Sequence, residues 1–257
     1  MKGFLVEMTN RALATVGYRA VRYPKAIQAD PSKELQISLM HALGSLRLQA
    51  TSEDSVFQFL QIGALELKGH FEPVAMARKF PDYRGILVDA QPVAIARLKE
   101  KYGSDVRINI VHAAITKSGE KVAFFHVDNS DGLFPDWVLG VASLNKQSIL
   151  KFSHEFPGLE DRVVESLVDG ATIASLLDQQ GFKSLDLLMI DAEGYDYELL
   201  RVFPFERMRP AVVFLEHSHL DASQREAAVS LLVGYRYRVA LLPSDILAVC
   251  GDLDSLV

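Results

Sequence analysis

Short apolar runs alternate with helical patterns from residue 56 onward. The run at 56–62 ends at Gly63, and the run at 86–88 ends at Asp89. Short apolar runs bounded by turn residues are typical of strands buried on both faces of a sheet. Further strands are expected at residues 107–111, 121–127, 185–190, 211–215, 235–242 and 246–250. The strand at 121–127 alternates and is expected to be additional to the main series.

Helical segments are expected between these strands, at residues 71–79, 92–101, 172–180, 197–203 and 222–233. Pro92 suits a first helical turn, and Gly181 is a typical stop signal. Strands that alternate with helices predict an α/β fold with a doubly wound, mostly parallel sheet and right-handed crossovers. Residues 1–50 are predicted to form an N-terminal helical extension, and residues 51–257 the main domain.

Composition narrows the class of protein. The chain has 257 residues, a net charge of -6 and 49% hydrophobic residues, so it lacks the basic footprint of a nucleic-acid-binding protein. No uncharged apolar stretch reaches about 18 residues, and Glu7 and Arg11 interrupt the first apolar segment, so neither a spanning helix nor a signal peptide is expected. The single cysteine, Cys250, excludes an internal disulfide. We therefore expect a cytoplasmic protein without membrane or nucleic-acid partners, and leave self-association into a homo-oligomer open.

The residues that follow each strand carry the candidate chemistry, because ligands of open α/β sheets bind beyond the carboxyl ends of the strands. The first turn begins Gly63-Ala64-Leu65 and has only the first glycine of the dinucleotide fingerprint. Leu65 and Lys68 occupy the other two glycine positions, which disfavours a nicotinamide or flavin dinucleotide. A P-loop pattern is absent too.

A nucleoside without phosphates fits these turns better. Gly63 and Ala64 would let a ligand approach the backbone, and Asp89 would accept hydrogen bonds from ribose hydroxyls. S-adenosylmethionine is such a nucleoside, and acidic turns would favour its sulfonium cation. Each residue also has a plainer interpretation, since Gly63 suits any tight turn and Asp89 any helix N-cap.

The most distinctive turn reads Ile190-Asp191-Ala192-Glu193-Gly194 and continues to Leu200. It resembles the signature of the FkbM-type methyltransferases, a subgroup of which shares the strand end Gln61-Ile62-Gly63-Ala64 and an acidic residue before a proline, here Asp89 and Pro92. The resemblance covers residues 56–250. It implies a seven-stranded sheet of the class I methyltransferase (Rossmann-like) type and S-adenosylmethionine as cofactor. The cofactor-binding positions that follow are Gly63, Ala64, Glu66, Asp89, Ala90, Ala113 and Asp191.

Two positions depart from the family pattern. The family's first turn usually has a glycine where Leu67 stands, and a bulkier loop would crowd the methionine half of the cofactor. The ribose acid is usually a glutamate followed directly by proline, whereas Asp89 is followed by Ala90. A rival hypothesis therefore stays open, in which the chain is a catalytically degenerate methyltransferase fold that serves as a binding or scaffolding module.

Methyl transfer requires the donor and acceptor to be held in line and, for a hydroxyl acceptor, the removal of a proton. His217 is predicted to be the general base, and Asp191 to orient it or to hold the substrate or the cofactor amine. The alternative is a Mg²⁺ or Mn²⁺ site formed by Asp191, Glu216 and His217, with His219 as a further ligand. The resemblance implies O-methylation of a hydroxyl on a small molecule, such as a sugar or a secondary metabolite.

Overall fold

A seven-stranded sheet forms the centre of the computed structural model, which describes residues 56–65 and 72–250. Its strand order is β3 (Ile108–His112), β2 (Tyr83–Asp89), β1 (Phe57–Ile62), β9 (Leu187–Ile190), β10 (Val212–Glu216), β12 (Asp245–Cys250) and β11 (Tyr237–Leu241). Neighbours from β3 to β10 pair in parallel, and β12 is antiparallel to both of its neighbours. The predicted doubly wound, mostly parallel sheet is confirmed, while the predicted extension at 1–50 lies outside the described residues.

Helices cover both faces of this sheet, as strand alternation requires. α6 (Ile173–Gln179), α7 (Asp196–Val202) and α8 (Ala222–Gly234) pack on one face, where they bury strand residues such as Leu60 and Val213. α3 (Pro73–Ala77) and α4 (Pro92–Tyr102) pack on the other face against residues such as Phe59 and Phe214. The same strands therefore supply both cores through their alternating side chains.

The helix starts follow from local sequence. Pro92 begins α4. Thr172 caps α6 through a reciprocal pair of hydrogen bonds with Ser175, in which the side-chain oxygen of each residue accepts from the backbone N–H of the other. Asp221 caps α8 in the same way with Gln224. These caps satisfy backbone N–H groups that have no partner within the helix. They therefore fix the turns that lead into α6 and α8.

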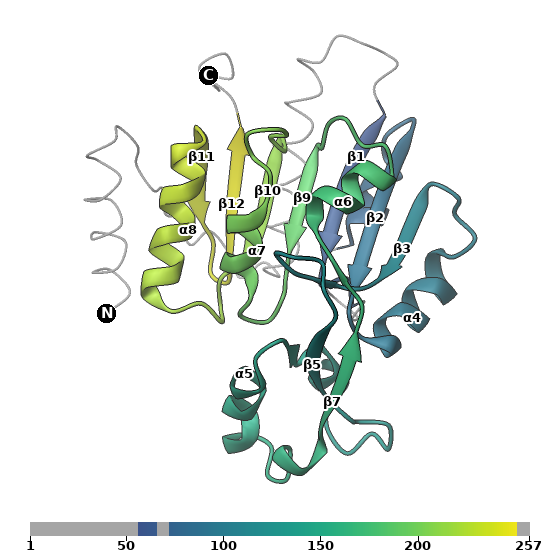
Figure 1. The fold of residues 1–257 in the computed structure, drawn as a ribbon, viewed down its shortest axis with the longest axis vertical. Helices are drawn as coiled ribbons and strands as arrows, with labels where there is room; N and C mark the ends of the chain where they lie inside the picture. Colours follow the sequence, from purple (N-terminus) through teal and green to yellow (C-terminus); the bar gives the residue numbers. More distant parts are fainter. Residues whose placement is uncertain (1–55, 66–71, 251–257) are drawn as a thin grey trace, which may run out of the picture.

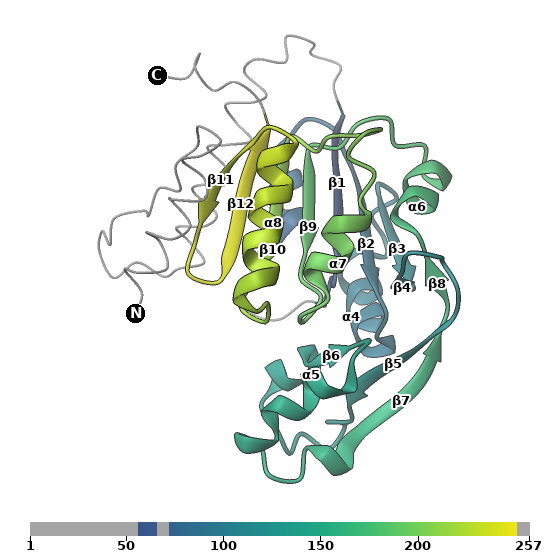
Figure 2. The ribbon, with the colours of Figure 1, turned by 60° about the vertical axis from the view of Figure 1, so that its left-hand side comes forward.

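A small lobe, defined as residues 122–168, lies beyond the carboxyl ends of the parallel strands (Figures 1 and 2). It contains β5 (Val122–Val127), β6 (Ala142–Ser143) and β7 (Val163–Val168), which form a separate antiparallel sheet. Its helical segments are η1 (Asp136–Gly140), α5 (Lys146–Leu150), η2 (Lys151–His154) and η3 (Glu160–Arg162). A two-stranded parallel pair, β4 (Ala114–Ile115) and β8 (Gly170–Ala171), joins the lobe to the main sheet. The strand predicted at 121–127 therefore exists as β5, in a sheet separate from the main one.

Aromatic side chains pack around the mainly aliphatic core of the small lobe. The ring of Phe156 lies 5.6 Å from that of Phe134 and 5.3 Å from that of Trp137, both at steep interplanar angles. Such edge-on pairs add to the stability gained by burying the rings. Phe134 is buried, and Trp137 keeps 39% of its surface exposed. The lobe thus has its own core and can present a defined surface to the main sheet.

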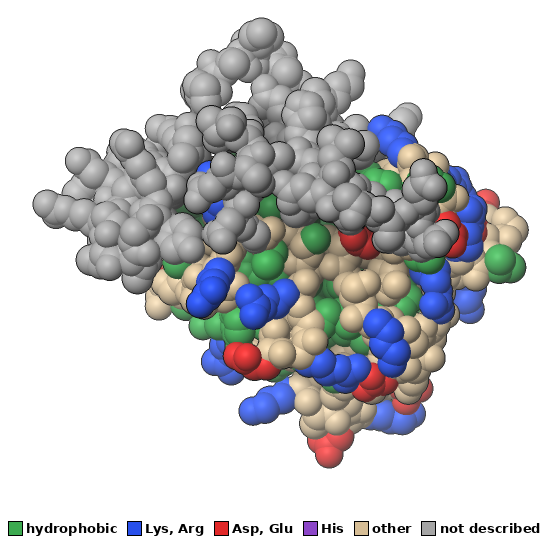
Figure 3. Space-filling view, turned by 90° about the horizontal axis from the view of Figure 1, so that it is seen from above, with side chains coloured by type: hydrophobic (Ala, Val, Ile, Leu, Met, Phe, Trp, Pro, Cys, Tyr) green, Lys and Arg blue, Asp and Glu red, His purple; other side chains and the backbone are tan. Residues whose placement is uncertain are grey.

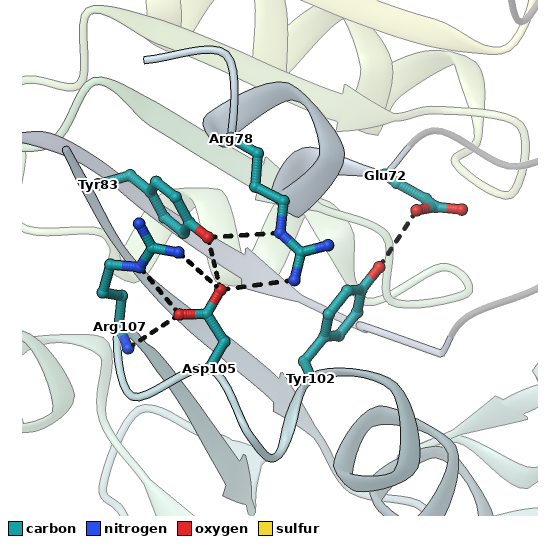
Figure 4. A network of polar contacts seen from close by, with 6 residues as sticks. All are labelled: Glu72, Arg78, Tyr83, Tyr102, Asp105 and Arg107. Carbon is teal, nitrogen blue, oxygen red and sulfur yellow. Dashed lines mark hydrogen bonds and ion pairs between the residues drawn. The ribbon is translucent and has the colours of Figure 1, made fainter. Parts of the chain in front are cut away.

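The opposite end of the sheet is held by a polar network (Figure 4). Asp105, in the turn before β3, accepts hydrogen bonds from the Tyr83 hydroxyl and the Arg107 guanidinium. Arg107 also lies 3.9 Å from the centre of the Tyr83 ring. Nearby, the Tyr102 hydroxyl donates to Glu72. This network fixes the amino ends of β2 and β3, far from the turns with candidate chemistry, and its role is structural.

Figure 3 looks onto this end of the molecule and shows Lys and Arg side chains on the described part of its surface. The carboxylates discussed below gather instead at the carboxyl ends of the strands, where they face the small lobe. Among the residues described, no helix combines the length and the apolar surface needed to cross a bilayer.

Candidate active site

Gly63 lies where the ends of two central strands come closest. It follows β1 with a φ of +74°, and a Cβ built on it would lie 1.6 Å from the carbonyl oxygen of Asp191. Backbone hydrogen bonds hold this approach, since Ile62 accepts from Asp191 and Val88 accepts from Gly63, each at 3.0 Å. Glycine is the residue that suits this position, because it tolerates both the left-handed backbone and the contact.

Asp89 ends β2 with a buried carboxylate. It accepts the backbone N–H of Gln91 at 2.8 Å. Burial raises the pKa of Asp89 to about 6, although the nearby N–H groups of Gln91, Leu65 and Ala64 pull the pKa down. A carboxylate is thus ionised at neutral pH in a buried position beside the first turn.

These two turns line a cavity of about 760 Å³. Of the predicted cofactor residues, Gly63, Asp89, Ala90, Ala113 and Asp191 all contribute to its wall. Ala64 is buried and does not line the cavity, and Glu66 lies outside the described residues. This volume includes space that is open to solvent, so the cavity is a cleft that a ligand can enter from outside.

Sequence reasoning missed the wall that the small lobe supplies. Phe124, Ala142 and Ser143 line the cavity from β5 and β6, opposite the strand ends. Leu65 of the first turn also lines the cavity, whereas Leu67, which departs from the family pattern, lies outside the described residues. The place of the small-lobe residues in the cavity wall depends on how the lobe docks, which no local pattern predicts.

The turn after β9 is shaped by a buried carboxylate. Asp196 is 1% exposed, and its two oxygens accept the backbone N–H groups of Ala192 at 2.8 Å and Gly194 at 2.9 Å. These bonds hold Glu193 and Gly194 at positive φ values of 50° and 97°. Asp196 therefore positions the neighbouring Glu193 side chain, which explains the acidic residue that follows the Glu-Gly pair in the sequence.

Asp191 and Glu216 bring carboxyl groups from two adjacent strands into contact. Burial raises the pKa of Asp191 well above its usual range, and repulsion from Glu216 and Glu193 raises it further. Burial likewise raises the pKa of Asp196 to about 7 and that of Asp245 to about 7. Like charges held this close cannot all ionise, so the cluster retains protons near neutral pH.

His217 does not lie in the cavity. Its backbone N–H donates to Ser244, its Nε2 lies 3.1 Å from the carbonyl oxygen of Leu242, and its side chain is buried against the β11–β12 turn. Successive strand residues point to opposite sides, so Glu216 and His217 diverge at the end of β10. Burial also lowers the pKa of His217. The predicted roles of His217 as general base and as metal ligand find no support in this geometry.

His219 lies where His217 was expected. The chain turns after β10, with Leu220 donating to the carbonyl of His217, and the turn brings His219 back toward Gly194. The Nε2 atom of His219 is 3.1 Å from Oε2 of Glu193 and 3.8 Å from Oε1 of Glu216. The hydrogen bond to Glu193 raises the pKa of His219.

The metal set predicted from sequence is only partly assembled. Asp191 and Glu216 lie together with Asp196, their oxygens within 4.8 Å of one another, but His217 is not part of this group. Glu193, Glu216 and His219 are equally close and already contact one another. Protons and the imidazole thus compensate the carboxylates, and we assign no ion to either group.

The carboxyl cluster makes a prediction about stability. The folded-state pKa values of Asp89, Asp196 and Asp245, at about 6, 7 and 7, lie above the ordinary value of 3.8. At pH values between the ordinary pKa and the folded-state pKa values, the folded protein therefore binds more protons than the unfolded chain. Its free energy of unfolding should fall as pH rises from about 5 to about 8. Asp105, whose pKa is lowered, is ionised in both states there and adds no slope.

Urea titrations in EDTA at both ends of this pH range would measure the fall. Asp245→Asn removes one member of the cluster, so the fall should be smaller and the thermal midpoint at high pH should rise, by about 2–4 °C for each kcal/mol of relieved repulsion. Stability that is constant or increases over this range would contradict the prediction.

The comparison with protein families agrees with the sequence resemblance. Residues 61–239 match the family model described as Methyltransferase FkbM domain. The search of curated proteins found no match to the chain. Among solved structures, a precorrin-6y C5,15-methyltransferase from Geobacter metallireducens is similar, with 14% identity, 90% of this chain and 94% of that chain covered, and a TM-score of 0.42. The N-terminal domain of human METTL16 in complex with SAH is similar at 10% identity, with 95% and 79% covered and a TM-score of 0.39.

Proposed function

Because this chain belongs to the FkbM methyltransferase family, we propose that it transfers a methyl group from S-adenosylmethionine to a hydroxyl of a small molecule, such as a sugar or a secondary metabolite. The observation that carries the proposal is the cavity of about 760 Å³. One part of its wall is suited to a nucleoside, and another part carries the carboxylates that a sulfonium and a hydroxyl would contact.

The residues present fit the cofactor. Asp89 offers a buried carboxylate to ribose hydroxyls, and Gly63 leaves the backbone open for close approach. The carboxyl cluster around Asp191 offers negative charge to a sulfonium. S-adenosylmethionine, when bound, would supply an electrophilic methyl group, and the chain's own task is then to hold the acceptor in line and take its proton.

The carboxylates and the imidazole at the strand ends suit the methylation of a hydroxyl. A hydroxyl becomes a good nucleophile as its proton leaves, and carboxylates and imidazole are the groups that most often accept it. Both kinds of group stand at the ends of β9 and β10, from Asp191 to His219. The small lobe closes the cavity from the other side, which would exclude water from the reacting groups.

Two measurements test the proposal. Calorimetry should show S-adenosylmethionine and S-adenosylhomocysteine binding at micromolar concentrations, and mass spectrometry should show a gain of one methyl group on an acceptor from a panel of methyl pyranosides and hydroxylated metabolites. Absence of cofactor binding at millimolar concentration would overturn the proposal and favour a binding module. We expect EDTA to leave the activity unchanged; loss of activity that Mg²⁺ restores would instead establish a metal requirement.

A further inference from the structure

A second cavity adjoins the first, and it has the features of an acceptor subsite. It is a small hollow of about 260 Å³, solvent-open space included, and it shares Ala142, Ser143 and Glu193 with the wall of the larger cavity. We propose that the acceptor hydroxyl binds here against the Glu193–His219 pair, and that His219 is the catalytic residue that takes its proton. This inference rests on the proposed methyl transfer.

The pair is built from two separate turns that meet at a glycine. A Cβ on Gly194 would lie 3.5 Å from the Cβ of His219 and 3.8 Å from the Oγ of Ser148. The turn after β9, the turn after β10 and helix α5 of the small lobe therefore converge on this point. Glu193 reaches His219 because Asp196 holds it at positive φ.

The pair is sheltered but remains accessible. The His219 side chain keeps 32% of its surface exposed and that of Glu193 keeps 26%. His217, by contrast, is 8% exposed, and its Nε2 contacts the carbonyl of Leu242. Of the two histidines after β10, His219 is thus the one that a ligand in these cavities can touch.

The proton transfer balances with the groups present. With Nε2–H donating to Glu193, the Nδ1 lone pair of His219 accepts the hydroxyl proton. The oxygen uses its electron pair to form the new C–O bond, and the C–S bond breaks with its electrons passing to sulfur, which leaves a neutral thioether. Glu193 then stabilises the resulting imidazolium, as a carboxylate does wherever it orients a histidine that acts as a general base.

The opposite wall of the second cavity favours a neutral hydroxylated ring. Phe152 of η2 lines the cavity with its ring 6.0 Å from that of His219, and Trp137 packs edge-on behind it at 5.9 Å. Lys151 and Glu193 supply one charge of each sign to the lining. An aromatic surface facing polar groups suits a pyranose, which has apolar C–H faces and a rim of hydroxyls.

Variants of the histidines test the catalytic assignment. His219→Ala should lower kcat by about 10²-fold or more with the best acceptor of the panel, while the Kd for S-adenosylmethionine stays within about twofold. Added imidazole should restore part of the activity, which a merely structural role would not allow. His154→Ala, an exposed histidine of the same lobe, is the matched control. A large loss of kcat in His217→Asn with none in His219→Ala would overturn the assignment.

Binding without the cofactor tests the subsite separately. Saturation-transfer NMR on the cofactor-free protein should show methyl α-D-glucopyranoside or methyl α-L-rhamnopyranoside in contact with the protein. Phe152→Ala should abolish this signal, and Val164→Ala, an exposed residue of β7, should keep it. No signal for the wild type, or an equal signal in Phe152→Ala, would overturn the subsite. Failure of the proposed function would show itself differently, as the absence of cofactor binding.

Discussion

Gly63→Ala is expected to lower the free energy of unfolding by about 2–5 kcal/mol and to abolish cofactor binding. The left-handed backbone at φ +74° costs an alanine about 1–2 kcal/mol. The new Cβ would also meet the carbonyl oxygen of Asp191 at 1.6 Å, and overpacking of this kind typically costs about 1–3 kcal/mol. The ends of β1 and β9 must separate to relieve the contact, which would displace both Asp191 and the cavity wall.

Gly181→Ala is the matched control for this prediction. Gly181 ends α6 with nearly the same backbone, φ +68°, but no atom lies within 4 Å of its built Cβ. The Gly181→Ala variant should lose only about 1–2 kcal/mol of unfolding free energy, from the left-handed backbone, and should bind S-adenosylmethionine normally. Urea denaturation and calorimetry on both variants separate the two effects. Equal losses of stability would show that the contact with Asp191 is not decisive.

The local sequence predicted this part of the site because its determinants are local. Gly63 and Asp89 each follow a short buried strand, and parallel neighbours bring their carboxyl ends to one edge. Pattern and topology together therefore placed both residues in the cavity. The family resemblance added Asp191, Ala90 and Ala113 without knowledge of any contact.

The positions of His217 and His219 relative to the cavities could not be predicted from sequence. Both follow β10 within three residues, and the outcome depends on where the strand stops alternating and on the turn closed by Leu220. That turn is set by packing against the β9 turn, which lies more than twenty residues away along the chain. Sequence spacing alone favours the first histidine, and the tertiary contact favours the second.

The small lobe was only partly predictable for a similar reason. β5 alternates, but β7 keeps Val164 and Leu167 exposed and lacks a regular pattern. Its pairing with β5 joins residues about forty positions apart, from Val122 with Val168 to Val127 with Val163. The lobe supplies one wall of each cavity, so the part of the site where we propose that the acceptor binds was the least accessible to sequence reasoning.

Asp89→Asn is expected to weaken the binding of S-adenosylmethionine by about 10²-fold. Hydrogen bonds to a charged group contribute about 1.5–3 kcal/mol each, and the ribose hydroxyls would lose an ionised acceptor. Wild-type affinity should also fall as pH is lowered through about 6, because burial raises the pKa of Asp89 to that value and the ionised form is the one that accepts both hydroxyls. One proton linked to binding changes Kd by about tenfold per pH unit below the pKa.

The Asn variant separates this carboxylate from the other groups that titrate nearby. Its affinity should be low and nearly constant between about pH 5 and 8, since the group responsible for the wild-type slope is gone. Asp178→Asn, which changes an exposed carboxylate of α6, should keep both the wild-type affinity and the wild-type slope. Calorimetric titrations at three pH values would measure the Kd for S-adenosylmethionine of the wild type and of both variants. If Asp89→Asn retained the slope, the linked proton would belong to the carboxyl cluster at Asp191, and the cofactor's sulfonium rather than its ribose would be the group that senses pH.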